Sequence, residues 1–127
     1  LTGLDNLYLA NNNISDISAL TGLTNLEVLD LYGNNISDIS ALTGLAKLES
    51  LIAPGNSISD ISALAGLTNL VWLNLSSNNI SDISPLVENS GLSAGDTVNL
   101  TGNPLSDTSV DVYIPQLEVR NVSVNLV

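Results

Sequence analysis

Apolar residues recur along the chain in a pattern that repeats every 22 residues. The heptapeptide ISDISAL begins at Ile14, Ile36 and Ile58, and the variant ISDISPL begins at Ile80. A fixed period of this length is typical of a solenoid, in which identical structural units stack to bury one continuous core. The complete frame of one unit is Leu23, Leu26, Leu29, Leu31, Asn34, Ile36, Ile39 and Leu42.

Each unit contains a Leu-x-Leu pair, which predicts a short strand because successive side chains of a strand point to opposite faces. Leu29 and Leu31 then point into the core, and their neighbours point outward. Stacking the units brings the strands together in one parallel sheet. An Asn follows each strand, and its amide is expected to bond backbone groups that the turn leaves unpaired. These residues are Asn12, Asn34, Asn56, Asn78 and Asn103.

The frame fits the leucine-rich repeat pattern LxxLxLxxNxL. Its copies beginning at Leu1 and Leu67 match at every position, and over residues 1–103 the period and the recurrent SDIS resemble the bacterial internalin type of leucine-rich repeat. The resemblance implies an α/β fold, a right-handed leucine-rich repeat solenoid with one parallel sheet on its concave face and short 3-10 or irregular segments on its convex face. We expect four regular copies and one irregular copy in residues 1–103, and a C-terminal cap in residues 104–127.

The recurrent aspartates precede the helical stretch ISAL, where a carboxylate can accept hydrogen bonds from the first free backbone N–H groups. Pro85 supports this placement, because proline is tolerated in a first helical turn. Stacked about 5 Å apart, the carboxylates could also form a ladder for cations. Calcium takes about six or more oxygen ligands, however, whereas each unit supplies one carboxylate that already serves as a cap. The four residues are Asp16, Asp38, Asp60 and Asp82.

The third copy departs from the frame, because Ala53 replaces a core Leu and Pro54 follows it. Both changes predict a weakened strand, since Pro removes a donor from the sheet and a Leu-to-Ala change in a core leaves a void. Departures of this kind arise either from function or from drift.

The C-terminal part loses the regular spacing, with three residues inserted before Asn103. Gly91 and Gly95 mark the altered loop. In the expected cap, Ser106 or Asp107 begins a short helix that is interrupted at Pro115. A closing strand follows, with alternating apolar residues at Val122, Val124 and Leu126.

The first copy has no capping element before it, so the sequence predicts that its core residues Leu4, Leu7, Leu9 and Ile14 are half exposed. Either further repeats precede Leu1 in the parent protein or a partner covers these side chains. The chain begins in register with a repeat and without an initiator Met, which is expected of an excised or processed piece.

Composition narrows the classes of partner. Aromatic residues make up only 3% of the chain, so the core is expected to be aliphatic. Two basic residues, Lys47 and Arg120, stand against 13 acidic ones, which disfavours nucleic acid and anionic membranes as partners. The acidic balance either maintains solubility or attracts a basic partner. The absence of Cys suits a secreted protein and a cytosolic protein equally.

Catalytic chemistry finds little support in the sequence. The chain has no His and no Cys, and it has no phosphate loop, zinc-ligand spacing or nucleophile elbow. We therefore predict no enzymatic activity, no catalytic residues, no cofactor and no metal site. We expect any function to come from the outward-facing residues, whose identity the repeat pattern does not fix.

The free positions on the strands form three outward columns. The first column is Asn6, Val28, Ser50, Trp72 and Thr97, the second is Tyr8, Asp30, Ile52, Asn74 and Asn99, and the third is Ala10, Tyr32, Pro54, Ser76 and Thr101. Aromatic residues rimmed by polar groups are typical of an interface centre, although exposed apolar residues also occur on surfaces without function. The candidate ligand-binding residues on this face are Tyr8, Val28, Asp30, Tyr32, Ile52, Trp72 and Asn74.

An acidic column, Asp5, Glu27 and Glu49, precedes the strands and would steer basic groups toward them. The sheet offers roughly 300 Å², well below the roughly 800 Å² per partner of a standard interface, so this chain alone is expected to bind weakly.

Two functions fit the pattern. The first is a non-catalytic module for protein or glycan binding or for adhesion, acting through the concave sheet; the resemblance implies a bacterial secreted or cell-surface location and makes binding to a host receptor one option among several. The alternative is a structural spacer or self-assembling stalk that stacks end to end through its uncovered first copy.

Overall fold

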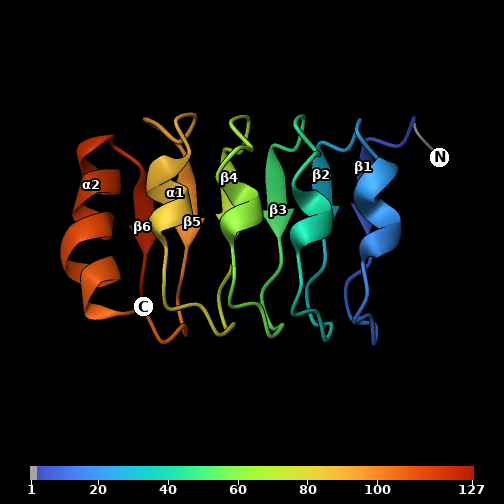
Figure 1. The fold of residues 1–127 in the computed structure, drawn as a ribbon, viewed down its shortest axis with the longest axis horizontal. Helices are drawn as coiled ribbons and strands as arrows, with labels where there is room; N and C mark the ends of the chain where they lie inside the picture. Colours follow the sequence, from blue (N-terminus) through green and yellow to red (C-terminus); the bar gives the residue numbers. More distant parts are fainter. Residues whose placement is uncertain (1–2) are drawn as a thin grey trace.

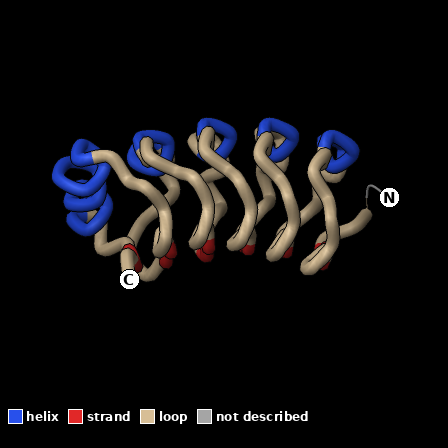
Figure 2. The backbone as a smooth tube through the Cα atoms, turned by 90° about the horizontal axis from the view of Figure 1, so that it is seen from below, coloured by secondary structure: helices blue, strands red, loops and turns tan. Residues whose placement is uncertain are grey.

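The computed structural model describes residues 3–127, so the expectations for Leu1 lie outside the described residues. Six parallel strands form one sheet in chain order (Figure 1). Figure 2 shows the strands along one side of the stack and the helical segments along the other, with the strands closer together, so the sheet lies on the concave face. The strands are β1 Asn6–Tyr8, β2 Val28–Asp30, β3 Ser50–Ile52, β4 Trp72–Asn74, β5 Thr97–Asn99 and β6 Ser123–Asn125.

One short helical segment follows each of the first four strands on the convex side, as predicted. The first three are 3-10 helices: η1 Ser18–Gly22, η2 Ser40–Leu42 and η3 Ser62–Leu64. The fourth is an α-helix, α1 Ser84–Glu88, and Pro85 lies in its first turn as expected. No helix in the described part of the chain is long and apolar enough to cross a membrane.

The core between the two sides is aliphatic. Its buried hydrophobic side chains are Leu, Ile, Val and Ala, and the inward residues Leu29, Leu51, Leu73 and Val98 of successive strands pair in register. Every buried side-chain nitrogen and oxygen of residues 3–127 has a hydrogen-bond partner.

The Asn after each strand ties its own coil, meaning one 22-residue unit, to the coil before it. Asn56 shows the arrangement: its Oδ1 accepts from the Ile36 N–H at 3.0 Å and its Nδ2 donates to the Leu31 carbonyl at 3.0 Å. The Asn residues at 34, 78 and 103 make the same pair of bonds to their preceding coils. Asn12 instead donates to carbonyls within its own turn. The predicted role of this amide is confirmed, and it extends between coils.

The third strand is not weakened by Pro54, contrary to the sequence-based expectation. β3 pairs in full register with β2 and β4, and the Pro54 carbonyl accepts from the Gly33 N–H at 3.0 Å. At the position equivalent to Pro54, the Tyr32 N–H bonds the Asp30 side chain rather than a neighbouring strand. Pro54 therefore removes no donor from the sheet.

The helix of the C-terminal segment begins after Ser106, as predicted, and the Ser106 Oγ accepts from the Ser109 N–H at 3.1 Å. The expected interruption at Pro115 is wrong. A π-helix, η4 Ser109–Tyr113, leads directly into α2 Ile114–Val119, with Pro115 in the first turn of α2. The wider π-turn accommodates a ring that would clash with the carbonyl four residues earlier in a regular α-helix. β6 follows as the predicted closing strand, centred on Val124.

Polar contacts that the frame does not reveal attach the cap to the repeats. Asn89 is fully buried, and its Nδ2 donates to the Leu64 and Leu67 carbonyls at 2.9 and 3.0 Å. Arg120, which follows α2, donates to the Asn89 and Val87 carbonyls. These bonds join the last helix to α1.

The first coil is only partly covered, as predicted. Leu4, Leu7, Leu9 and Ile14 are partly exposed, whereas their equivalents in the second coil are completely buried. We therefore expect backbone amides of Leu7 and Leu9 to exchange with solvent much faster than those of Leu73 and Leu75, because opening starts where fewest apolar contacts must break.

Hydrogen exchange followed by NMR in a dilute monomer measures this difference. Adding one upstream 22-residue unit should slow exchange at Leu7 and Leu9, since each fully covered side chain gains at most about 1.5 to 3 kcal/mol. Equal protection of the first and fourth strands without that unit would contradict the prediction.

Replacing Asn56 by Ala should lower the free energy of unfolding by about 1 to 3 kcal/mol, because the buried Ile36 N–H loses its acceptor. Asn12→Ala is the matched control. Its amide bonds only exposed groups of its own turn, so the loss should be clearly smaller. Urea unfolding monitored by circular dichroism checks both variants, and equal losses would show that the bond between coils is not what stabilises the stack.

Candidate functional site

The concave face presents the outward columns in the predicted register. Val28 pairs with Ser50 and Ser50 with Trp72 in the first column, and Tyr8 pairs with Asp30 and Asp30 with Ile52 in the second. Three aromatic side chains project most strongly from the face, with exposed fractions of 64% for Tyr8, 50% for Tyr32 and 49% for Trp72. The other candidate residues, Val28, Asp30, Ile52 and Asn74, are half-buried between them.

Tyr8, Asp30 and Tyr32 form one group, in which Tyr8 ends β1, Asp30 ends β2 and Tyr32 follows β2 by two residues. Tyr8 is the register partner of Asp30, and the Asp30 Oδ1 accepts from the Tyr32 N–H at 3.0 Å. The ring of Tyr32 leans toward the next coil, where a Cβ atom added to Gly55 would lie 3.6 Å from its Cε1. Asp30 is thus the register neighbour of Tyr8, and its carboxylate is bonded to the backbone of Tyr32, whose ring leans toward the third coil.

Trp72 lies beside the acidic column. The Glu49 carbonyl accepts from the Val71 and Trp72 N–H groups at 2.8 and 3.1 Å, and the Glu27 and Asp5 carbonyls accept from the equivalent groups of the preceding coils. Val71, whose side chain is 48% exposed, continues this column where the others have acids. Sequence reasoning missed Val71, although its alignment with Glu27 and Glu49 placed it outside the core frame.

Asp30 and Asn74 have a structural role besides any role in binding. The Asn74 Oδ1 accepts from the Ser76 N–H at 3.1 Å and the Ser76 hydroxyl at 2.8 Å, which matches the bond from Tyr32 to Asp30. These bonds do not use the donors of the Asn74 amide or the remaining acceptor sites of the Asp30 carboxylate.

Neither basic residue belongs to the outward columns. The Lys47 ammonium donates to the Asn25 side chain at 2.8 Å, and the Arg120 guanidinium is bound to backbone carbonyls of Val87 and Asn89. The outward columns therefore carry carboxylate groups and no basic side chain, a balance that favours a cationic ligand.

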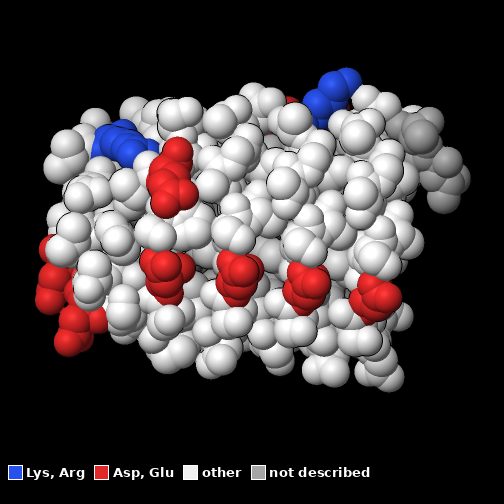
Figure 3. Space-filling model, in the orientation of Figure 1, with Lys and Arg blue, Asp and Glu red and all other residues white. Residues whose placement is uncertain are grey.

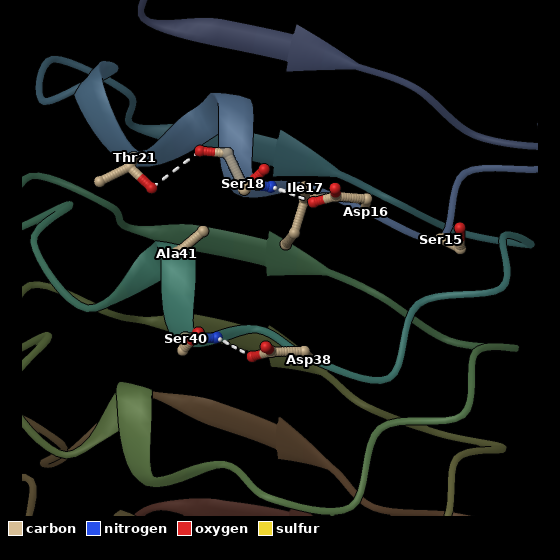
Figure 4. Close-up of a pocket in the computed structure, with 8 residues that line it drawn as sticks. All are labelled: Ser15, Asp16, Ile17, Ser18, Thr21, Asp38, Ser40 and Ala41. Carbon is tan, nitrogen blue, oxygen red and sulfur yellow. Dashed lines mark hydrogen bonds between the residues drawn. The ribbon is translucent and has the colours of Figure 1, made fainter.

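The convex side carries the predicted aspartate row. Figure 3 shows evenly spaced acidic side chains across the helix-bearing face. Each carboxylate Oδ1 accepts from the first backbone N–H of the following helix: Asp16 from Ser18 at 2.9 Å and Asp38 from Ser40 at 2.8 Å (Figure 4). Asp60 and Asp82 make the same bond to Ser62 and Ser84. The predicted capping role is confirmed.

Open depressions of 430 to 450 Å³ lie between successive helices of this side, each flanked by two of these aspartates. Within residues 3–127, no three acidic, His or Cys side chains gather closely enough to hold a metal ion. The aspartates serve the local turns, and the ladder offers no coordination shell of six or more oxygens.

The capping bonds lower the pKa of Asp16, Asp38 and Asp60 below the usual value of 3.8, chiefly through the backbone N–H of Ser18, Ser40 and Ser62 and secondly through the same serine side chains. A carboxylate with a lowered pKa in the folded state stabilises the fold above its unfolded pKa, and the contribution is lost as the pH falls through the folded pKa.

We expect a variant with all three aspartates changed to Asn to lose less stability on acidification below about pH 4 than the wild type. The Asn side chain still accepts the backbone bond but does not titrate in this range. Urea midpoints of both proteins at neutral and acidic pH measure the difference, and identical pH dependence would contradict the assignment.

Comparison with known proteins identifies the fold. The leucine-rich repeat family, in its two-copy form, matches residues 2–44 and 46–92. Among curated proteins, no sequence matches the chain significantly. A leucine-rich repeat protein of Leptospira interrogans shares the fold with a TM-score of 0.77 at 21% identity, over 98% of this chain and 38% of its own.

Two solved Listeria monocytogenes structures are more similar in sequence. Internalin C2 is 35% identical with a TM-score of 0.85, over 99% of this chain and 53% of its own. The internalin inlF is 33% identical with a TM-score of 0.65, over 98% of this chain and 42% of its own. The chain thus spans about half the length of these proteins or less. It belongs to the leucine-rich repeat family and, within that family, to the bacterial internalin type.

Proposed function

We propose that the chain is a non-catalytic recognition module of a bacterial secreted or surface protein and that it binds a partner protein through its concave sheet. The observation that carries the proposal is the exposure of Tyr8, Tyr32 and Trp72 on this one face, while the core holds only aliphatic side chains. In this proposal residues 1–103 provide the face and residues 104–127 close the stack.

The frame does not require aromatic residues at these positions. The same columns contain Ser50, Ser76 and Thr97 in other coils, and those coils keep the same strand pairing. Each exposed ring offers a large rigid contact area at low cost in conformational entropy, with polar neighbours to fix orientation. Three such rings on a concave sheet favour an interface over unconstrained surface.

The size of the face sets the expected affinity. Six strands about 4.8 Å apart and an outward width of roughly 13 Å give roughly 300 Å², against roughly 800 Å² per partner in a standard interface. Weak binding is expected from this chain alone. Since the chain spans about half of internalin C2, tight binding would use surface beyond it.

The test is capture of surface proteins from bacterial and host-cell fractions on the immobilised chain, comparing the wild type with a Tyr32→Ala and Trp72→Ala double variant. The double variant should reduce specific capture at least about tenfold, because truncating buried interface aromatics typically costs about 2 kcal/mol or more. A Val112→Ala and Val119→Ala variant, which removes exposed apolar groups from the cap, should bind as the wild type does. Unchanged capture by the aromatic variant would overturn the proposal.

The alternative function, a spacer that stacks end to end, is favoured by the partial exposure of Leu4, Leu7, Leu9 and Ile14 in the first coil. Stacking would bury these side chains against another copy. Sedimentation at rising concentration separates the two functions, since a spacer should form larger species that a Leu7→Lys substitution abolishes. A protein that stays monomeric at every concentration excludes the spacer.

A further inference from the structure

We infer that the concave face recognises an extended segment bearing arginine side chains, two of which bind at two subsites made of aromatic and acidic residues. The inference rests on the proposed function, because it names the chemistry of the partner that the same face would hold.

The first subsite is the group Tyr8, Asp30 and Tyr32. Asp30 lies directly beside Tyr8 on the adjacent strand and is tied to Tyr32 through the backbone bond of 3.0 Å. That bond uses Oδ1 and holds the carboxylate in one orientation. A guanidinium placed here can stack on a Tyr ring and donate to the carboxylate, two interactions that reinforce each other.

The second subsite is Trp72 with Glu49. Trp72 is half exposed and pairs with Ser50, the residue that follows Glu49, and the Glu49 carbonyl accepts from the Trp72 N–H. This bond places the Glu49 backbone next to that of Trp72, and in the proposal the exposed Glu49 side chain supplies the carboxylate of the subsite. Trp is the aromatic side chain with the strongest attraction for a cation above its ring.

The charge of the face fits this ligand and disfavours others. Asp5 and Glu27 extend the row that ends at Glu49, and the outward columns contain no Lys or Arg. An acidic segment or a phosphorylated one would meet mainly carboxylates, whereas a cationic segment meets Lys47 as the one basic residue close in sequence to Glu49, and the Lys47 ammonium is directed to the Asn25 side chain at 2.8 Å. Both basic residues of the chain already donate hydrogen bonds elsewhere.

The dimensions favour a single extended segment over a globular surface. A face roughly 13 Å wide accommodates one chain lying across the strands. Asp30 on β2 and Trp72 on β4 lie two strands apart, about 9 to 10 Å, and are offset by two residues, about 6 to 7 Å, along the strand direction. The separation is therefore roughly 12 Å, and the length of the arginine side chains bridges the part that the peptide backbone does not cover. In a polyproline II segment, residues three apart project from the same side and are separated by about 9.3 Å. Arginines three residues apart would therefore reach both subsites.

The experiment uses a peptide of three Arg-Ala-Pro units, an otherwise identical peptide with citrulline in place of Arg, and the 127-residue chain. Trp72 is the only Trp, so its fluorescence reports occupancy of the second subsite directly. We expect the arginine peptide to shift the Trp72 emission saturably. The citrulline peptide, which keeps the shape and loses the charge, should bind at least about tenfold more weakly.

Matched substitutions locate the interaction. Asp30→Asn with Glu49→Gln should weaken binding of the arginine peptide at least about tenfold, and the amide introduced at position 30 would keep the backbone bond as Asn74 does in its own coil. Asp38→Asn with Asp60→Asn makes the same change in net charge on the convex side and should alter binding less than about twofold.

The inference fails if citrulline and arginine peptides bind equally, if the convex variant loses as much affinity as the concave one, or if the arginine peptide leaves Trp72 unperturbed. These outcomes are separable from failure of the proposed function. If capture of a partner depends on Tyr32 and Trp72 but the chain does not respond to the arginine peptide, the proposed binding face stands and the inference of an arginine ligand fails.

Discussion

The structure depends on the need to satisfy backbone groups at the turn after each strand. The chain cannot do so within one coil, because the Ile N–H groups at 14, 36, 58 and 80 find their acceptor on the Asn of the following coil. A single coil therefore has an unmet donor as well as an uncovered apolar surface. When two coils stack, one supplies the acceptor that the other lacks, and each covers apolar surface of the other. Hydrogen bonding and hydrophobic burial therefore impose the same stacking and the same register.

This constraint divides the residues of every coil into two classes. The frame positions are fixed by burial and by the bonds between coils, whereas the outward positions of the strand carry only weak local demands. One such local bond is not needed in every coil. The side chains of Asp30, Asn74 and Asn99 accept a hydrogen bond from the backbone N–H two residues later. In the third coil Ile52 has no side-chain acceptor and Pro54 has no N–H, so this bond is absent there. The concave face can therefore vary its chemistry without disturbing the stack, and the demands of the stack do not account for its aromatic and acidic residues.

Features that follow the 22-residue period could be predicted from the sequence, because each copy is an independent test of the same interpretation. The columns, the Asn bonds and the aspartate caps all belong to this group. Features that occur once were harder to predict. The helix through Pro115 depends on a local π-turn. The buried Asn89 of the irregular copy and the buried Ser109 of the cap each bond backbone groups of earlier coils. The tolerance of Pro54 depends on which N–H groups leave the sheet. The candidate face could be located from the sequence, but its two subsites required the register between strands, and no pattern within the chain specifies the partner.

The Asn bonds point in one direction, always from a coil to the coil before it, and this has a consequence for how such a protein can change over evolutionary time. After one whole unit is duplicated or deleted inside the array, every remaining Asn still has a coil before it. No backbone donor or acceptor therefore loses its hydrogen-bond partner at the new junction. Changes of other lengths alter the period, and the three residues inserted before Asn103 show that an insertion is tolerated where both bonds to the preceding coil are kept. Recombination between copies can thus lengthen or shorten the concave face in steps of one strand, about 4.8 Å each, while the two ends stay unchanged. The length of the concave face can in this way change by inherited duplications or deletions, each of which leaves a sequence that still folds.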